Sequence, residues 1–575
     1  MRAFPRRAFM RKPANLLFGV DESPPLSVAL LNGLQHAGVI AINLVYPVIV
    51  FRTAGVTAEA VTALLGIGCC ILGIATFLQA LHKGPVGSGY MCPATFTATY
   101  LAPSVLAVKT GGLSLVFGMT IFAGLLEAAL ARVLYKLRAF VPVELSGLVI
   151  LLIGITVSLV AIRTFLGTTT SAPSAAEWMV AGATLAVTVV LNIWGKGLAR
   201  MLCALLGIVC GYLAAFFLGV LSEGELGPIA AASWIAIPHW EHSGWSFDAG
   251  LVAVFSIAAL AAALKAIGTI NVCQRTNDAE WVRPDSRSIG RGVLADGLGT
   301  AIAGLFGGVG INTSTPSAGL VSATGVASRI VAFVVGAIFL VVGMTPKFTA
   351  LLAVMPRSVM AAALLFAACF IAVSGLQVIS SRMLDVRRTL VIGMGLITGL
   401  AVEAIPAVTA GITGWLKPII GSSLVFGTLV AFLLNLVFRL GVRRAVVLDI
   451  DPAGYDPVKI DEFLRAQGAA WGARPDVVNR AIFGVTQLIE TVLEPEGSPG
   501  TLHLEAGFDE YNLDVRLRYE GVALEFPQTR PSLSEIQESE SGARRLAGYL
   551  LRRNAERVRA DQAGSYAIIQ FHFDH

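Results

Sequence analysis

The feature that most constrains this chain is a succession of long apolar runs. From Ser27 to Leu440 these runs follow one another, each close to the ~20 residues that an α-helix needs to cross a bilayer. Only 14% of the 575 residues are charged, against roughly a quarter in soluble globular proteins. The pattern predicts an all-α polytopic membrane protein and excludes a simple cytosolic enzyme. A net charge of +5 over this length forms no basic stripe, which excludes nucleic-acid binding.

Hydropathy divides this region into fourteen predicted spans, two of them short. Lys and Arg follow the even-numbered spans, for example at Arg132, Lys196 and Arg275, whereas the loop 221–250 contains neither residue. Because cytoplasmic loops carry the excess of Lys and Arg, both termini are predicted to be cytoplasmic, in a multi-pass protein of the cytoplasmic (inner) membrane. Segment 1–26 is basic without a cleavage site, and is expected to remain as a cytoplasmic N-terminal segment. The predicted spans are 27–50, 59–81, 86–103, 110–131, 143–166, 177–195, 200–220, 249–273, 289–308, 312–326, 327–346, 357–376, 387–405 and 420–440.

The transmembrane domain, 27–440, is expected to contain two repeats, 27–220 and 249–440. At an offset of 223 residues, GPVGSGYMCP (84–93) superposes on GGVGINTSTP (307–316), and these are the short third and tenth spans. Seven spans per repeat is an odd number, so the two halves would be inverted relative to each other. Short, Gly/Pro-interrupted segments at matching places of inverted repeats are typical of a transporter's midplane binding site. A coincidental pair of kinked spans is the alternative.

Each short segment is expected to run as extended chain and to begin a half-helix at its proline, Pro93 or Pro316, since proline favours the first helical position. Cys92 and Thr315 would then be the caps. A helix start exposes unpaired N–H groups and about half a positive charge, so two of them would form a pocket for an anion or a carbonyl group. The candidate substrate contacts in these segments are Tyr90, Cys92, Ala94, Thr95, Thr315, Ser317, Ala318 and Gly319.

Ionisable residues inside the predicted spans are further candidates. Lys265 lies deep in span eight, where a cation is costly and is usually functional or paired. The alternative is a lysine neutralised by a structural carboxylate or snorkelling to the interface. Asp296 and Glu403 are the available acids, and His36 in span one is a candidate proton relay or a satisfied core histidine. The seven cysteines lack ligand spacing, so no metal site or disulfide is predicted. No cofactor and no catalytic residue is expected.

Six motifs between residues 14 and 440 resemble the nucleobase/ascorbate transporter family, also called the second nucleobase-cation symporter family. The resemblance implies a fourteen-span, seven-plus-seven inverted repeat with core and gate domains, a purine, pyrimidine or ascorbate substrate, and often proton coupling in bacteria. A homodimer in the lipid bilayer is also expected. The motifs are GLQH (33–36), GPVGSG (84–89), FVPVELSGLVILLIG (140–154), ADGLGT (295–300), TGVASR (324–329) and MPRSVM (355–360).

The chain departs from this family where the family binds its substrate. The family usually has Gln or Glu, then Asn, shortly before the glycine that matches Gly319, and here those positions hold Pro316 and Ser317. The family's acid in span eight matches Lys265, and the polar position one turn later matches Thr269. A carboxylate accepts hydrogen bonds from a neutral base, whereas a lysine donates to an anion or a carbonyl. The substitutions favour an anionic substrate, such as a urate or xanthine monoanion.

After Arg444 the composition becomes charged and polar, and residues 447–575 are predicted to form a cytosolic α+β domain. The pattern indicates a helix over 477–493, a strand hairpin over 501–521, and a helix, turn and strand over 541–573. This order resembles the ATP-binding fold of histidine kinases and anti-sigma-factor kinases.

The nucleotide motifs of that fold are altered in the tail. Gln487 and Thr491 stand where that family has Glu and Asn, and its Asp-x-Gly motif reads Tyr519, Glu520, Gly521. A regulatory or dimerising module without catalysis is therefore expected, with a plain packing domain as the alternative.

Three functional classes remain open. The first is a secondary transporter of a purine-like (xanthine or urate) or related heterocyclic anion, with or without proton coupling. The second is an inorganic or carboxylic anion carrier like the sulfate permease family, which shares the fourteen-span fold but carries a tail of another type. The third is a nutrient receptor or a membrane-tethered kinase that signals through the tail.

Overall fold

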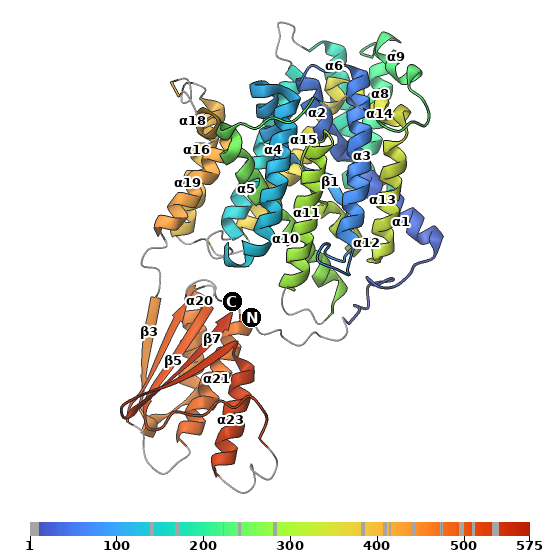
Figure 1. The fold of residues 1–575 in the computed structure, drawn as a ribbon. Helices are drawn as coiled ribbons and strands as arrows, with labels where there is room; N and C mark the ends of the chain where they lie inside the picture. The colour runs from blue at the N-terminus through green and yellow to red at the C-terminus, as the bar shows by residue number, and fades with distance from the viewer. Residues whose placement is uncertain are drawn as a thin grey trace. The chain divides into compact units, whose positions relative to one another are not determined.

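The computed structural model describes the chain at residues 11–137, 143–166, 173–221, 223–239, 243–279, 285–380, 384, 386–405, 407, 411–412, 416–438, 444–471, 473, 475–493, 500–508, 512–531 and 540–574. The chain divides into two compact units, residues 1–435 and 436–575 (Figure 1). The first unit is helical, and the second combines a sheet with helices.

The first unit is built from apolar helices. Among the described residues, seven are long and apolar enough to cross a membrane, or eight if the bent pair Arg329–Gly343 and Pro346–Ala353 counts as one span. Each predicted span coincides with one or more helices of this unit or, for the third and tenth, with a short strand followed by a helix, which confirms the polytopic all-α class. The elements are α1 (Leu26–Ala41), η1 (Ile42–Leu44), α2 (Val45–Thr53), α3 (Ala58–Ala80), β1 (Ala94–Phe96), η2 (Ala98–Tyr100), α4 (Leu101–Leu137), α5 (Val143–Leu166), α6 (Ala175–Trp194), α7 (Leu198–Met201), α8 (Cys203–Phe217), α9 (Glu223–Ala231), η3 (Ala249–Leu251), α10 (Val252–Asn277), α11 (Ser286–Leu305), β2 (Ile311–Thr313), α12 (Thr315–Thr324), α13 (Arg329–Gly343), α14 (Pro346–Ala353), α15 (Arg357–Ile379), α16 (Val386–Ala404), α18 (Leu416–Ile420) and α19 (Ser423–Phe438).

Close helix pairs show how the two halves of this unit are related. Gly73 in span two lies against Gly336 in span eleven, where a Cβ on Gly73 would come within 2.6 Å of the Gly336 carbonyl oxygen. Gly124 in span four lies in the same way against Gly297 in span nine, again at 2.6 Å. Exchanging the two halves converts the first pair of spans into the second. The packing thus has the symmetry of a seven-plus-seven repeat, and small residues permit these close backbone approaches.

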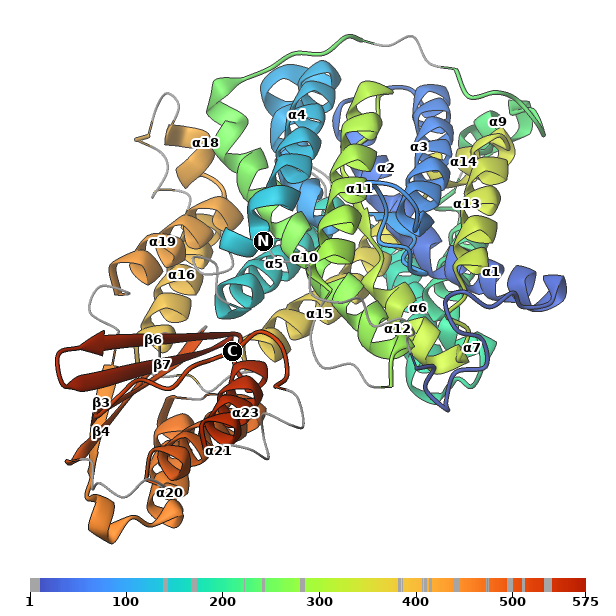
Figure 2. The ribbon, with the colours of Figure 1, turned by 60° about the horizontal axis from the view of Figure 1, so that its bottom comes forward.

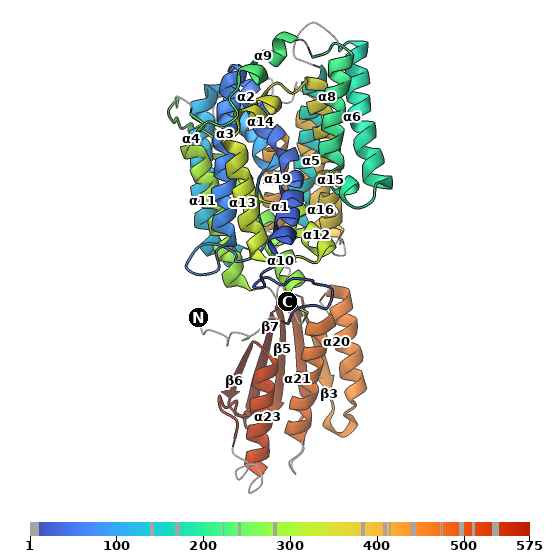
Figure 3. The same ribbon diagram turned by 90° about the vertical axis from the view of Figure 1, so that its right-hand side faces the viewer.

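The helices form two groups within this unit. One contains α3, α4, α10, α11 and α13, and the other contains α5, α6, α8, α15 and α16 (Figure 3). The second group is centred on the pair α5 and α15, where a Cβ on Gly147 would lie 3.0 Å from the Gly375 carbonyl oxygen. These groups correspond to the core and gate domains that the family resemblance implies.

The two short predicted spans meet in a two-stranded antiparallel sheet. β1 pairs with β2 in a register that places Thr95 opposite Asn312, and every residue of both strands is buried. A short helix follows each strand. The helix after β1 ends at a break within α4, where Gly112 has a φ of 72°, and α12 ends at Gly325 with a φ of 70°. Both breaks use a left-handed conformation that favours glycine.

The second unit is a five-stranded antiparallel sheet with helices on one face (Figure 2). The strand order is β3-β4-β5-β7-β6, and buried residues alternate along β4, as expected for a sheet with one packed face. The elements are β3 (Arg444–Ile450), η4 (Pro452–Gly454), α20 (Pro457–Trp471), α21 (Pro475–Leu493), β4 (Leu502–Phe508), β5 (Asn512–Glu520), α23 (Glu540–Asn554), β6 (Arg557–Ala563) and β7 (Tyr566–Asp574).

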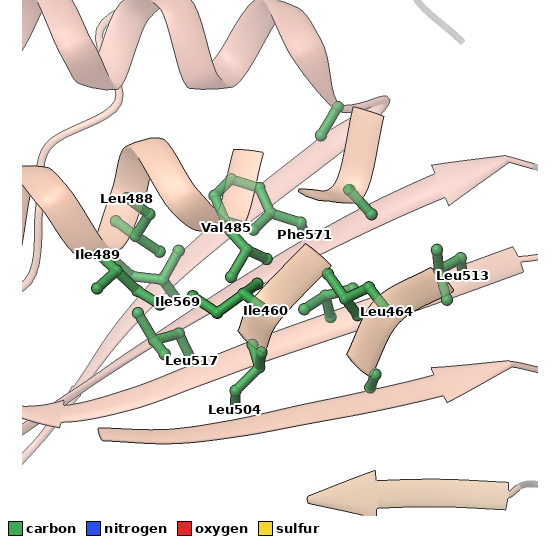
Figure 4. Close-up of a cluster of buried hydrophobic side chains, with 14 of the residues drawn as sticks. Ile460, Leu464, Val485, Leu488, Ile489, Leu504, Leu513, Leu517, Ile569 and Phe571 are labelled. Atoms are coloured by element: carbon green, nitrogen blue, oxygen red, sulfur yellow. The ribbon is translucent and has the colours of Figure 1, made fainter. Parts of the chain in front are cut away.

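Apolar side chains from the helices and strands form the core of this unit, among them Ile460, Val485, Leu504 and Phe571 (Figure 4). The predicted helix and hairpin are confirmed as α21 and the β4–β5 pair. The single strand predicted near the C-terminus is two strands, β6 and β7. Gly564, at a φ of 64°, turns the chain between them, and such a conformation suits a two-residue hairpin loop.

Candidate functional site

Both half-helices begin at a hydroxyl residue that directly follows its strand. Thr97 caps η2, and its Oγ1 accepts a hydrogen bond from the Thr99 N–H at 3.3 Å. Ser314 caps α12, and its Oγ accepts from the Ser317 N–H at 3.4 Å. Each cap satisfies one of the N–H groups that a helix start leaves unpaired. Because β1 and β2 are antiparallel, the two helix starts lie at opposite ends of the strand ladder.

The predicted start of the first half-helix at Pro93 is wrong. Pro93 and Cys92 precede β1, so Cys92 is not a helix cap, and Ala94 and Thr95 lie in the strand instead of a helix. The second start was predicted closely: α12 begins at Thr315 with Pro316 in its first turn, although the cap is Ser314.

The physical reason for this error is a difference in length. Gly84 and Gly307 match at an offset of 223 residues, whereas the caps Thr97 and Ser314 match at 217. The first segment therefore contains six more residues before its helix. Proline is compatible with extended chain as well as with a helix start, so its presence does not distinguish the two.

The polar groups of β1 are occupied by neighbouring spans. The Ala94 N–H donates to Thr76 Oγ1 of α3 at 3.0 Å. Thr95 Oγ1 accepts from the Asn43 side chain at 2.7 Å, and Asn43 lies in η1, the break in the first span. Ala94 and Thr95 therefore hold the strand in place through these bonds, and the Ala94 N–H is engaged within the protein.

Lys265 of α10 lies beside the first helix start. Its Nζ donates to Thr97 Oγ1 at 3.3 Å. Among the residues that the structure describes, no carboxylate forms an ion pair with Lys265. Thr269 donates to the Lys265 carbonyl oxygen at 2.9 Å, so in its 2.8 Å contact with Thr315 Oγ1 the Thr315 hydroxyl is the donor. Lys265 and Thr269 thus connect the starts of both half-helices.

One side of this arrangement is open. Thr315 and Gly319 on α12 and Gly268 on α10 are exposed, although they belong to helices whose other faces are buried. A Cβ on Gly268 or Gly319 would have no other atom within 4 Å. Lys265 itself is only partly buried. The structure therefore brings a cationic group, hydroxyl groups and a helix N-terminus to the edge of an open space.

A cluster of buried polar groups lies behind Lys265. Asn312 of β2 donates to Asp296 Oδ2 at 2.5 Å and to the Ala262 carbonyl oxygen at 2.9 Å. Tyr100 donates to Glu127 Oε2 at 3.3 Å, and the Glu127 side chain is fully buried. Glu127 was not among the residues predicted from the sequence. Its position in the apolar run GLLEAAL of span four is the same signal that singled out Lys265.

The remaining predicted residues are placed elsewhere. Tyr90, Cys92 and Ala318 pack together in a buried apolar cluster. Glu403 forms an ion pair with Arg163 at 2.9 Å, which joins α16 to α5. His36 is fully buried in α1, and neither ring nitrogen has a hydrogen-bond partner among the described residues. In the part of the chain that the structure describes, no group of His, Cys, Asp or Glu side chains could hold a metal ion.

These features define a class of protein: a membrane transporter built on an inverted repeat, with its candidate site where two half-helices begin. Comparison with known proteins then gives the family. Residues 28–408 match the xanthine/uracil permease model described as "Permease family", and the chain belongs to this family. It is a permease and not an enzyme.

The chain aligns with individual relatives over most of the length of each relative. The chain is 30% identical over 432 residues to the putative purine permease CPE0397 of Clostridium perfringens, covering 74% of this chain and 93% of that protein. It is 27% identical to the xanthine permease XanP of Escherichia coli, over 74% and 95% of the two chains. Murine Slc26a9, an anion transporter, has a similar fold, with a TM-score of 0.51 at 12% identity over 75% of this chain and 71% of that chain.

Proposed function

We propose that this permease carries a purine-like heterocycle, of the xanthine or urate type, in an anionic form. The relatives named for purine and xanthine transport support the substrate class. The observation that carries the anionic form is the ammonium group of the partly buried Lys265. It donates a hydrogen bond to a threonine hydroxyl and has no carboxylate ion-pair partner among the described residues. A bound anion supplies the missing negative charge.

The second half-helix supports this proposal. Ser317 is fully buried and bonded to Ser314, with 2.9 Å between their hydroxyl oxygens, and Pro316 has no N–H to donate. Neither residue presents the amide or carboxylate that reads a neutral base in the family. The N-terminus of α12 instead offers partial positive charge, and the exposed Thr315 hydroxyl lies on it.

A smaller carboxylic or inorganic anion is the second candidate. The same absence of base-reading groups at Pro316 and Ser317 favours it, since a lysine and a helix N-terminus recognise charge without reading a ring. The absence of obstructing atoms within 4 Å of a Cβ on Gly268 or Gly319 is compatible with a flat ring against these two glycines and favours the first candidate.

Transport by the full-length chain in proteoliposomes tests the proposal. The panel contains labelled urate, xanthine, uracil, ascorbate, bicarbonate and sulfate, with and without an inward proton gradient. Saturable uptake of urate or xanthine is expected, and a gradient that increases it would show proton coupling. Uptake of bicarbonate or sulfate alone would replace the heterocycle by the small-anion candidate.

We further propose a homodimer in the cytoplasmic membrane, with both termini on the cytoplasmic side. The basic residues after even-numbered spans support the orientation, for example Arg275 at the end of α10. A reporter fused after residue 445 is expected to report the cytoplasm, and an external location would overturn the orientation. Light scattering of the purified chain measures the mass, and a monomeric mass would overturn the dimer.

For the tail, we propose a regulatory module that does not hydrolyse ATP. Tyr519 is 3% exposed, burial raises the pKa of its phenol, and its hydroxyl donates to the Val522 carbonyl oxygen at 3.0 Å. Thr491 is likewise buried and donates to the Gln487 carbonyl oxygen at 2.7 Å. Both groups serve internal packing at the altered motifs. No hydrolysis by the full-length chain above background is expected, and turnover that is lost in Gln487→Ala would contradict the proposal.

A further inference from the structure

The sheet of the second unit has two edge strands, and they differ in how they are protected. Among the described residues, β3 forms one edge of the sheet and β6 forms the other (Figure 3). An edge strand presents unpaired N–H and C=O groups that can bind another strand, and charged side chains on the edge oppose such pairing. On β6 three charged residues, Arg557, Arg559 and Asp561, are exposed. The β6 edge is therefore protected against pairing.

The β3 edge lacks this protection. The centre of the strand reads AVVL (445–448), and Val447 on it is 57% exposed. The strand contains no proline. The charge of Asp449, near its end, is turned to the neighbouring strand, with 2.5 Å between Asp449 Oδ1 and His503 Nδ1 of β4. A regular apolar edge of this kind is a surface on which another strand can pair.

The sequence of β3 suits pairing with a second copy of itself. Two copies related by a two-fold axis perpendicular to the sheet pair antiparallel, with equivalent residues on the same face. The register that uses all seven residues of β3 places Val447 opposite its own counterpart and Val446 opposite Leu448. Asp449 then lies opposite Ala445, so the two aspartates do not face each other. Like charges directly opposite would destabilise the pair, and this register avoids them.

The attachment of β3 to the membrane spans favours a second copy over a different protein. Five residues, 439–443, separate the end of α19 at Phe438 from the start of β3 at Arg444. The proposed homodimer therefore attaches two such strands to one assembly through short linkers. A short linker raises the effective concentration of one strand for the other to the order of mM. Pairing of the two strands then requires little intrinsic affinity.

We propose that β3 is an interface between two copies of the chain, and that the two tails join their five-stranded sheets edge to edge. The inference rests on the proposed homodimer. Main-chain hydrogen bonds between the two β3 strands occupy the groups that the edge leaves unpaired. The two Val447 side chains cover each other across the axis. The charged β6 strands then form both outer edges of the joined sheet.

Disulfide cross-linking of the full-length chain in membranes tests this contact. Residues directly opposite in an antiparallel pair have Cα atoms about 4.5–5.5 Å apart, a separation that a disulfide can bridge. Val447→Cys is expected to give a product of twice the chain mass after mild oxidation. Val522→Cys is the matched control and should not cross-link, because Val522 is 87% exposed but lies after β5, away from the edge. The wild type gives the background, since its seven cysteines all lie in the first unit.

A charge at position 445 tests the register. In the Val447→Cys background, Ala445→Asp places a carboxylate opposite Asp449 of the other copy, whereas Ala445→Lys places an ammonium group there. Like charges destabilise a cross-strand pair and opposite charges stabilise it, so the Asp variant should cross-link several-fold less than the Lys variant. Ala445 is exposed, so both variants are expected to fold. Equal cross-linking of the two variants overturns the proposed pairing.

Light scattering of the purified wild type separates this inference from the proposed homodimer. A dimeric mass without cross-linking at position 447 overturns the β3 pairing and leaves the homodimer. A monomeric mass without cross-linking overturns both. A cross-linked product of any other mass shows that a different protein occupies the edge, which also overturns the pairing.

A second variant covers the case in which Val447→Cys does not fold. The register places positions 445 and 449 of the two copies opposite each other, so Ala445→Cys/Asp449→Cys should also give a product of twice the chain mass. The two positions are four residues apart on one extended strand, roughly 13 Å at the rise of a β-strand, and cannot bridge within one copy. Absence of this product overturns the proposal.

Discussion

The two short segments that meet at the strand pair both form a strand followed by a half-helix, but they differ in length and in how the helix begins. The second segment passes from Gly307 to β2 within four residues and begins α12 directly after it, with a proline in the first turn. The first segment needs six more residues and begins its helix with the 3-10 turn η2. The first segment accepts a hydrogen bond from Lys265, through Thr97. The second contacts the same helix, α10, through Thr315 and Thr269. The comparison shows that repeats can preserve a site through strand pairing and caps while their local sequence diverges.

The largest expected effect comes from the longer loop of the first segment. Gly87 has a φ of 94°, and a Cβ there would lie 2.3 Å from the Leu81 carbonyl oxygen. Gly87→Ala is expected to abolish folded protein, measured by monodisperse elution after membrane extraction. Gly84→Ala is the matched control, since Gly84 has a φ of 97° but open space around it. It should lose only roughly 1–2 kcal/mol. Equal yields of the two variants would show that the extra residues are not tightly packed.

Loss of the lysine has the next largest effect. A charge-assisted hydrogen bond is worth ~1.5–3 kcal/mol, so Lys265→Met should weaken urate binding roughly tenfold or more while the protein still folds. Calorimetry of the purified chain provides the measurement. Lys109→Met is the control, because Lys109 is exposed on α4 and its loss should leave the affinity unchanged. Wild-type affinity in Lys265→Met would identify the lysine as structural and refute the anion hypothesis.

The two caps separate stability from binding. Thr97→Ala and Ser314→Ala should each lower the free energy of unfolding by about 1 kcal/mol, as for other helix N-caps, measured by thermal unfolding in detergent. Only Thr97→Ala is expected to reduce urate affinity as well, because Thr97 also holds the Lys265 ammonium group. Thr97→Ser should restore both properties. An equal loss of affinity in Ser314→Ala would make the two segments equivalent at the ligand.

The smallest effect is expected at an acid that lies outside both segments. Glu403→Gln removes the ion pair with Arg163, whose side chain is 64% exposed, and exposed pairs contribute about 0–1 kcal/mol. Uptake of urate by this variant should retain its dependence on a proton gradient. Loss of that dependence would return Glu403 to the coupling role that its position in span thirteen indicated.

The parts of the fold that follow from membrane physics could be predicted from sequence. Bilayer thickness imposes span lengths, so the fourteen segments and the position of Lys265 in one of them could be found by counting. The start of the first half-helix could not, because Pro93 suits extended chain as well as a helix. The pairing of Thr95 with Asn312 depends on contacts between residues far apart in the chain. Glu127 followed the same rule as Lys265 and was recognisable in principle.

The pairing of β1 with β2 also limits how the molecule can move. Main-chain hydrogen bonds join the two repeats at this point, and every residue of the two strands is buried. Separating the strands would leave these groups without water or partners, at a penalty of several kcal/mol for each group in a bilayer. The two helix starts therefore stay together in any motion that keeps these bonds. We expect relative motion between the two groups of helices to occur along the surface where the group around this strand pair meets the helices grouped around α5 and α15.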